Sequence, residues 1–445
     1  MNPEFERNLW LELTPRRVLQ MVIVLGLIFL TLKVADPFDG RDRAAEFLFF
    51  AIVVIWGTRE AAQSVVEEIR DRTWDFQRLS ALTPFNMTWG ELFGATSYIW
   101  LGGLICLAVM IAVQGSPVRP LNIFADLAIG LTAQSAALFA SLLAVRRRQS
   151  ITRLSVFQYQ MFGIATAAAM WALWEPVANA TMPIGISRVL WWNVTFDGRP
   201  FLAVSFALLL ICLAAGCYRL MRLELQMQNR PLVWTGFIAI AAIYAAGFGR
   251  LPDSVNVAIP ESEVALRLMA AALALLVVTY AAVLHEPKDR VLYRWLTEMA
   301  QKRRWTALLS RVQCWMIAYA ATLLVGVFLL VRLQMMDANS LAHQQLIPLT
   351  IAVSGFLTRD LGIILYFALV PGQKRGDMPA IVALAALYGL GPQLLRSAGI
   401  DNPDFILPAF TGGWLGAAFA WAEAIGVWTL VFKRPFRTGV VSTRS

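Results

Sequence analysis

Long apolar runs recur from one end of the chain to the other, and they constrain the fold more than any other feature. The chain has 445 residues, of which 58% are hydrophobic and only 15% are charged, whereas about a quarter of the residues in a soluble domain are charged. Inside a bilayer every backbone polar group needs a partner, and a helix supplies those partners within one segment. The runs are too long for barrel strands and lack their alternation. The sequence therefore predicts an all-α polytopic membrane protein.

Twelve apolar segments are candidates for membrane-spanning helices. The run at 45–58 is short for a hydrocarbon core of about 30 Å, and we expect its helix to continue beyond Arg59. The predicted spans are 18–34, 45–58, 95–114, 122–145, 155–175, 200–218, 232–249, 264–284, 312–331, 345–370, 378–395 and 408–432.

The positions of the basic residues predict the orientation of these spans. Most of the 38 Lys and Arg residues fall in the N-terminal segment and in every second loop. Because loops rich in Lys and Arg stay in the cytoplasm, we expect both termini to be cytoplasmic. We also expect the protein to lie in the plasma membrane, which in a bacterium is the inner membrane. This distribution also explains the net charge of +9, so we expect no nucleic-acid partner.

The residues before the first span predict a helix at the membrane surface. Phe5, Leu9 and Leu13 recur every four residues, with charged residues on the other faces, which is typical of a helix lying among lipid headgroups. The alternative is a plain cytoplasmic tail. No cleavage signal is evident, and we expect the first span to be retained.

The order of spans and charged loops suggests two parallel halves, 1–230 and 231–445, with six spans each. Each half has two spans, a long charged cytoplasmic segment, two spans, a basic inner loop and two further spans. The charged segments share Asp-Arg followed by an aromatic residue and an Arg. An even number of spans per half predicts halves related by an axis along the membrane normal.

Motifs for catalysis or nucleotide binding are absent from the sequence. It contains no G-x-x-x-x-G-K-[ST] loop, which would cradle phosphates, and no G-x-S-x-G or H-E-x-x-H motif. The four Cys residues lie in apolar runs, and the two His residues are far apart. We therefore expect a chain that is not an enzyme and that binds no metal or cofactor.

The segment after the second predicted span resembles the signature of ATP-binding-cassette (ABC) export permeases of the type-2 class. In that signature an acidic residue precedes G-T-x-[acidic], then Leu, Thr-Pro and a G-K-L-x-G run. Arg72 stands where the signature has Gly, and Glu91 where it has Lys. The matching residues lie in "DRTWDFQRLSALTPFNMTWGELFGA" and are Asp71, Thr73, Asp75, Leu79, Leu82, Thr83, Pro84, Gly90, Leu92 and Gly94.

The resemblance implies a permease half followed by a diverged second half. It implies a separate cytoplasmic ABC ATPase in two copies, which would bind ATP and Mg²⁺, and short re-entrant helices between spans five and six, where "PIGISRVLWWNVTF" begins at Pro183. It also implies coupling segments at about 59–92 and 286–310 that dock on the ATPase. The residues assigned to coupling are Arg70, Asp71, Arg72, Thr73, Trp74, Asp75, Leu82, Thr83, Pro84, Asp289 and Arg290.

Local physical chemistry suits the first coupling segment. The residue before a proline disfavours helix, so we expect one helix to end near Leu82 and another to begin at Pro84. Gly90 and Gly94 then allow close helix packing. Without the resemblance, the alternative is an amphipathic helix in water that has no partner.

Three charged residues fall in the middle of predicted spans, Arg359 and Asp360 in the tenth and Glu423 in the twelfth, and Asp126 lies near the outer end of the fourth. Charge at this depth costs about 2.5–3.5 kcal/mol on insertion scales, and such groups usually find a partner. Arg359 is expected to pair with Asp360 or Glu423. The group is a candidate for substrate contact or gating, and the alternative is a structural ion pair. Gly412, Gly416, Ala420 and Ala424 form a small-residue face for helix packing.

Two transport mechanisms remain open at this point. The resemblance favours a permease driven by a separate ATPase. Twelve spans in two parallel halves also describe secondary transporters that use an ion gradient. A membrane anchor or assembly factor is a third reading. The substrate is unknown, although sparse charge within the spans favours an apolar or amphipathic cargo.

Overall fold

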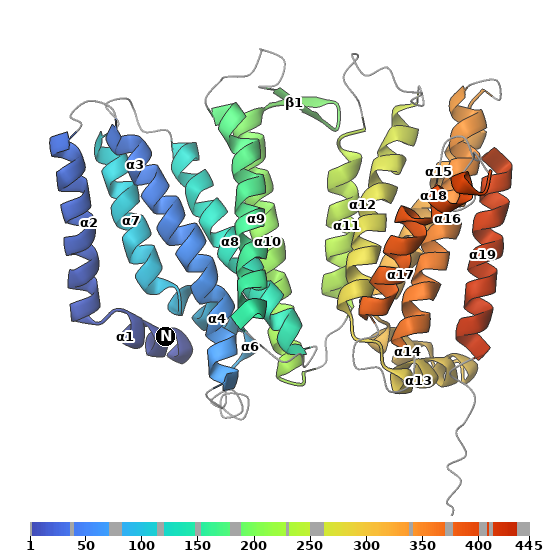
Figure 1. Ribbon diagram of the computed structural model, residues 1–445, viewed down its shortest axis with the longest axis horizontal. Coiled ribbons are helices and arrows are strands. Elements are labelled where there is room, and N and C mark those ends of the chain that lie inside the picture. The colour runs from blue at the N-terminus through green and yellow to red at the C-terminus, as the bar shows by residue number, and fades with distance from the viewer. Residues whose placement is uncertain are drawn as a thin grey trace, which may run out of the picture. The chain divides into compact units, whose positions relative to one another are not determined.

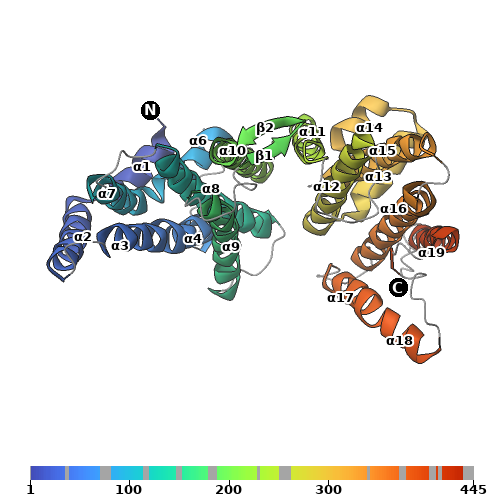
Figure 2. The same ribbon diagram turned by 90° about the horizontal axis from the view of Figure 1, so that it is seen from above.

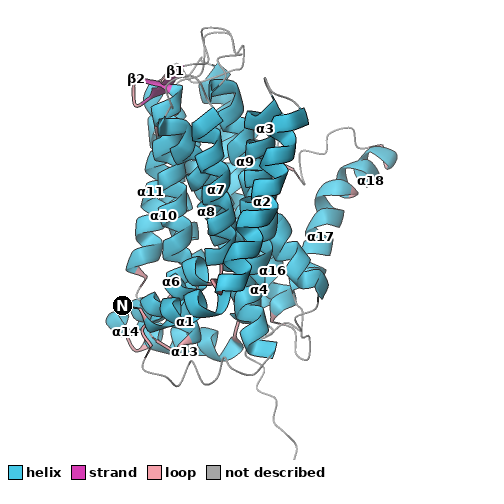
Figure 3. Cartoon of the chain, turned by 90° about the vertical axis from the view of Figure 1, so that its left-hand side faces the viewer, coloured by secondary structure: helices cyan, strands magenta, loops and turns pink. Residues whose placement is uncertain are grey.

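The protein is described by a computed structural model that covers most of the chain. The described residues are 2–35, 40–70, 82–113, 120–146, 153–178, 188–227, 231–249, 262–337, 341–369, 377–399, 407–408 and 413–433. They are almost entirely helical, and a single two-stranded hairpin is the exception among them (Figure 3). They form two compact units, residues 1–189 with 195–229 and residues 190–194 with 230–445.

The first unit is a bundle in which α8 is the central helix. Nearly three quarters of the apolar stretch of α8 is buried (72%), whereas α2, α9 and α10 bury 17–28% of theirs. α1 lies across the lower end of this bundle, beside the upright helices (Figure 1). The helices are α1 (Pro3–Glu12), α2 (Pro15–Ala35), α3 (Gly40–Phe49), η1 (Phe50–Trp56), α4 (Gly57–Arg70), α6 (Pro84–Trp89), η2 (Gly90–Gly94), α7 (Ser97–Val113), α8 (Pro120–Arg146), α9 (Arg153–Ala178) and α10 (Gly198–Glu224).

The second unit has α16 at its centre, packed along α19. Gly355 and Gly362 of α16 allow this contact, because a Cβ at Gly355 would lie 2.9 Å from Cβ of Ala420. Gly416, Ala420 and Ala424 are buried, which confirms the predicted packing face, while Gly412 lies outside the described residues. The helices are α11 (Leu232–Ala246), α12 (Glu263–His285), α13 (Arg290–Gln301), α14 (Trp305–Arg311), α15 (Cys314–Gln334), α16 (Leu341–Ala368), α17 (Asp377–Gly389), α18 (Gly391–Ser397) and α19 (Gly413–Lys433).

Nine helical segments in the described residues are long and apolar enough to cross a bilayer, and the protein is therefore an all-α polytopic membrane protein. Three of the twelve predicted spans fall short of that measure. The run at 45–58 is divided among α3, η1 and α4, and α11 has only 15 residues. α7 qualifies only together with Pro84–Gly94, from which it is bent by 49°. We treat Ser97–Val113 as the membrane segment there.

α3, η1 and α4 form one helix without a break from Gly40 to Arg70. Its middle, Phe50–Trp56, has the wider π-helical turn, which leaves carbonyls without their usual partners. Side chains of neighbouring helices supply the missing donors: Gln134 Nε2 donates to the Val53 carbonyl at 3.0 Å, and Gln160 Nε2 donates to the Ile55 carbonyl at 3.0 Å. The predicted continuation of this helix beyond Arg59 is confirmed.

The segment expected to form a re-entrant helix is instead a β-hairpin over its described part. β1 (Arg188–Trp191) pairs with β2 (Val194–Asp197). Trp192 and Asn193 at the turn have φ of 51° and 61°, the left-handed values that a two-residue hairpin turn of type I′ requires. Asn suits that conformation, and β-branched and aromatic residues on either side favour strands. The expectation of a re-entrant helix in the stretch that begins at Pro183 was therefore wrong for its described part, Arg188–Phe196.

Candidate functional site

The predicted coupling segment of the first half is described at its two ends. Arg70 is the last residue of α4, and Leu82, Thr83 and Pro84 begin the next described stretch. Asp71, Arg72, Thr73, Trp74 and Asp75 lie outside the described residues.

Thr83 and Pro84 start a helix as predicted. The Thr83 backbone is extended, and its hydroxyl accepts a hydrogen bond from the Asn86 amide at 3.2 Å. Pro84 occupies the first helical position, where its missing N–H costs nothing. This N-cap fixes the direction of α6, which continues directly into η2.

Three aromatic side chains form a row along α6 and η2. Phe85 and Trp89 stack with ring centroids 5.8 Å apart, and Trp89 and Phe93 are 4.3 Å apart. Phe85 is 58% exposed and Trp89 is 44% exposed. An exposed aromatic pair at the end of a bundle suits contact with a partner protein or with the membrane interface.

The opposite face of the same stretch receives α1. A Cβ at Gly90 would lie 2.5 Å from Cγ of Glu4, and one at Gly94 would lie 2.8 Å from Cβ of Asn8. Asn8 Nδ2 also donates to the Gly90 carbonyl at 3.2 Å. The two glycines of the signature-like run therefore form the seat of the N-terminal helix. Trp10, on the outer face of α1, is 81% exposed.

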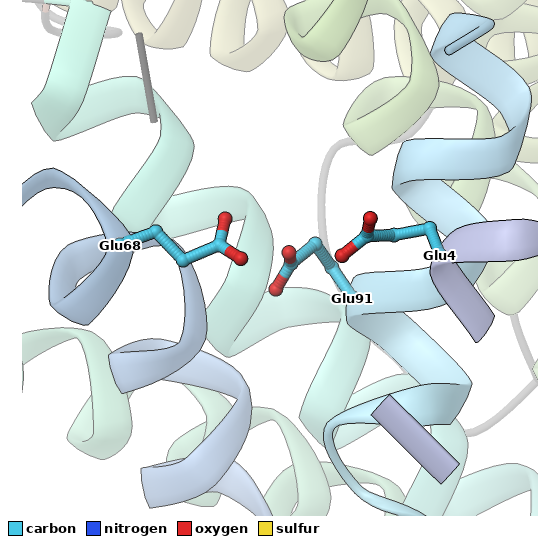
Figure 4. Close-up of side chains that lie close together, drawn as sticks. All are labelled: Glu4, Glu68 and Glu91. Atoms are coloured by element: carbon cyan, nitrogen blue, oxygen red, sulfur yellow. The ribbon is translucent and has the colours of Figure 1, made fainter. Parts of the chain in front are cut away.

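Three glutamates from three elements meet where α1, α4 and η2 join. Glu4, Glu68 and Glu91 place carboxylate oxygens within 4.8 Å of one another, with Glu91 between the other two (Figure 4). Arg7 Nη2 lies 2.5 Å from Glu4 and 2.6 Å from Glu68. The guanidinium thus already supplies the positive charge for two of the three carboxylates.

Burial governs the protonation of this cluster. It raises the pKa of Glu91 well above the usual range of a glutamate, and the nearby negative charge of Glu68 raises it further. Burial also raises the pKa of Glu4, against the opposing effect of Arg7. A protonated Glu91 can share its proton with a neighbouring carboxylate, which removes the repulsion between like charges. Arg7 and a proton on Glu91 together offset the repulsion among the three carboxylates that meet here.

The second predicted coupling segment, 286–310, consists largely of α13 and α14. Asp289 caps α13, since its carboxylate accepts from the Val291 amide at 2.9 Å. Arg290 is the first residue of α13. α13 is amphipathic, with Leu296 and Met299 buried.

A buried glutamine ties α13 to the membrane helix α15. Gln313 Oε1 accepts from the Tyr293 hydroxyl at 2.6 Å and from Trp315 Nε1 at 2.7 Å. Its Nε2 donates to the Pro287 carbonyl at 3.0 Å. One side chain therefore holds the loop before α13, α13 itself and the first turn of α15.

The predicted pairing of the charges within the spans is confirmed. Arg359 on α16 contacts Asp360 through Nε at 3.0 Å and Glu423 on α19 through Nη1 at 2.6 Å. Two tyrosines that the sequence did not reveal complete the network. Tyr280 from α12 and Tyr388 from α17 each donate to Asp360 Oδ2, at 2.7 and 2.6 Å. Their role has no signature in the sequence, because one tyrosine in an apolar run looks like an interfacial aromatic residue.

Two cavities accompany these groups. One of about 680 Å³ lies in the first unit beside η1, α4 and α9, with Arg59, Gln63, Arg70 and Gln160 among its lining residues. The other, of about 470 Å³, lies in the second unit beside Arg359 and Glu423.

Comparisons of the chain with protein-family models, with curated protein sequences and with solved structures find no match.

Proposed function

We propose that the protein is the membrane-spanning permease subunit of an ATP-driven ABC exporter and works with a separate cytoplasmic ATPase. The observation that supports this most is the unbroken helix from Gly40 to Arg70. It carries the membrane segment directly to the stretch whose sequence resembles a coupling motif. A rigid helix of this kind would transmit a push on that stretch to the spans.

Contacts at the same end of the unit would spread such a push. Arg7 joins α1 to Glu68 near the end of α4, and Gly90 and Gly94 seat α1 on the arm that leads into α7. Movement of the stretch after Arg70 would therefore shift α1, α4 and α7 together. In the second unit, Gln313 would carry a push on α13 into α15.

The proposal includes two parallel halves of six spans. This division into halves is supported by the position that the most buried helix of each unit has in the order of spans. α8 buries 72% of its apolar stretch and α16 buries 56%, while every other candidate span buries 28% or less. Both correspond to the fourth span of their half. The protein would hold the membrane pathway and no catalytic residue, with ATP and Mg²⁺ bound by two copies of the partner ATPase.

Co-purification tests this proposal. The chain is co-expressed with a candidate ABC ATPase, and both complex formation and stimulation of ATP hydrolysis are measured. Trp89→Ala and Arg70→Glu should weaken both, because they alter the exposed aromatic pair and the end of α4. Trp10→Ala is the matched control, because it removes an exposed tryptophan from the outer face of α1. An ATPase that neither co-purifies nor responds to the permease would refute the proposal.

A gradient-driven transporter is the second candidate, and the network around Arg359 favours it. Buried charges within spans often bind or relay ions, and three charged residues and two tyrosines meet here. Transport in proteoliposomes that persists without ATP and collapses with the ion gradient would establish this alternative.

A further inference from the structure

A cavity of about 470 Å³ opens beside the charge network of the second unit. Its lining comes from α16, α17 and α19. α16 packs against both α17 and α19 (Figure 2), and residues of all three helices line the cavity. Most of its lining is apolar: Ile363, Leu387, Gly426, Val427 and Leu430. Its volume falls within the roughly 300–1,000 Å³ of sites that hold drug-sized molecules.

The charged groups at this cavity are unequally accessible. The Arg359 side chain is only 3% exposed and is held between two carboxylates, whereas the Glu423 side chain is 35% exposed. Asp360 is buried and accepts from two tyrosine hydroxyls. The charge that a ligand in the cavity would meet is therefore the carboxylate of Glu423.

The balance of charge also favours a positive ligand. One arginine faces two carboxylates, so the network carries one excess negative charge when both are ionised. An anion would meet that excess and would find the guanidinium already occupied. A bare metal ion would lack the several oxygen ligands it requires, because the walls are apolar.

We propose that this cavity binds a monovalent organic cation with a bulky apolar body, and that Glu423 is its counter-ion. This inference rests on the proposed transport function and names the substrate class. The apolar walls would cover the body of the ligand, and Glu423 would divide its interaction between Arg359 and the ligand. A partly buried carboxylate, surrounded by a medium of lower dielectric constant than water, attracts a cation more strongly than a carboxylate in water does.

Binding of tetraphenylphosphonium to the purified full-length chain tests this assignment. We expect saturable binding that tetraphenylborate, an anion of the same shape, does not displace. Glu423→Gln should weaken binding by about tenfold or more, because it removes the counter-ion and keeps the side-chain shape. Glu298→Gln is the matched control: it removes an exposed carboxylate from α13 and should leave the affinity unchanged.

A second variant keeps the test decisive if Glu423→Gln does not fold. A Cβ at Gly426 would meet no atom within 4 Å, so Gly426→Leu should extend into the cavity while every charge stays in place. It should abolish tetraphenylphosphonium binding. Absence of saturable binding to the unaltered chain, or binding that both variants leave unchanged, would overturn the assignment. Because no ATPase is present, failure here is separate from failure of the permease proposal, which depends on co-purification.

Discussion

At the scale of single residues, the signature-like stretch performs two different tasks. Gly90 and Gly94 could be predicted to sit at a close helix contact, because small residues four apart make a smooth face. Their partners could not be predicted, since Glu4 and Asn8 of α1 lie more than eighty residues away along the chain. Glu91 stands between these glycines and is buried against Glu68. Its departure from the signature thus lies inside the protein and not on the surface that would meet a partner.

Gly90→Val should displace α1. The added Cβ would lie 2.5 Å from Cγ of Glu4 and 3.2 Å from its backbone carbon, and overpacking of this kind costs about 1–3 kcal/mol. The midpoint of thermal unfolding in detergent should fall, as followed by tryptophan fluorescence. Gly26→Ala in α2, where a Cβ meets nothing within 4 Å, serves as the control. Equal midpoints for the two variants would contradict the seat described for α1.

Glu91 should make stability depend on pH. Because its pKa is raised in the folded protein, Glu91 keeps a proton at pH values where the unfolded chain has lost it. The stabilisation that Glu91 contributes is therefore fully present below the ordinary glutamate pKa and is lost as pH rises through the raised pKa of Glu91. The unfolding temperature should fall over that range, and Glu91→Gln should flatten the fall. Glu298→Gln should leave it unchanged, because the contact with Lys302 lowers the pKa of Glu298.

At the scale of elements, the structure decides how surface helices connect to the spans. The amphipathic pattern of α13 is visible in the sequence, yet its attachment depends on one glutamine that belongs to the turn before α15. The hairpin β1–β2 is another case. Its sequence is apolar enough for a helix, and the turn at Trp192 and Asn193 is stabilised by contacts with distant residues, including Trp192 N to the Gly247 oxygen at 2.9 Å.

Gln313→Leu should detach α13. It leaves the Tyr293 hydroxyl, Trp315 Nε1 and the Pro287 carbonyl without this partner. The cost is about 1–3 kcal/mol for a buried group such as Trp315 Nε1, and smaller for the two part-buried groups. Limited trypsin digestion should then cut faster at Lys302 and Arg303, with mass spectrometry identifying the sites. Gln334→Leu, at the exposed opposite end of α15, should digest at the original rate. Unchanged cleavage in Gln313→Leu would show that α13 is held by other contacts.

At the scale of the whole molecule, the number of spans fixes where the termini lie. Within the described ranges, nine helical segments are long and apolar enough on their own, and an odd number of spans would place the termini on opposite sides of the membrane. The helix Gly40–Arg70, α7 and α11 would raise the number to twelve. The positions of the Lys and Arg residues favour twelve, because each basic loop then faces the cytoplasm.

Reporter fusions should distinguish these topologies. With twelve spans, a fluorescent protein fused after the last residue should fluoresce in the cytoplasm, and alkaline phosphatase at the same place should be inactive. Phosphatase fused after Gly249, beyond α11, should be active because that loop would lie outside. An active phosphatase at the C-terminus would contradict the twelve-span topology.

The class of the protein and the positions of its apolar helices could be predicted from the amino-acid sequence. The reason is local: hydropathy and helical hydrogen bonding act within one segment, so the twelve runs could be found without knowing their neighbours. The sequence also placed the helix start at Pro84 and the pairing of Arg359. Three features became visible only in the folded protein: Glu4, Glu68 and Glu91 meet, Tyr280 and Tyr388 bind Asp360, and a cavity opens beside Glu423. Each of these brings together side chains from separate helices, and no local pattern encodes which faces of distant helices will pack.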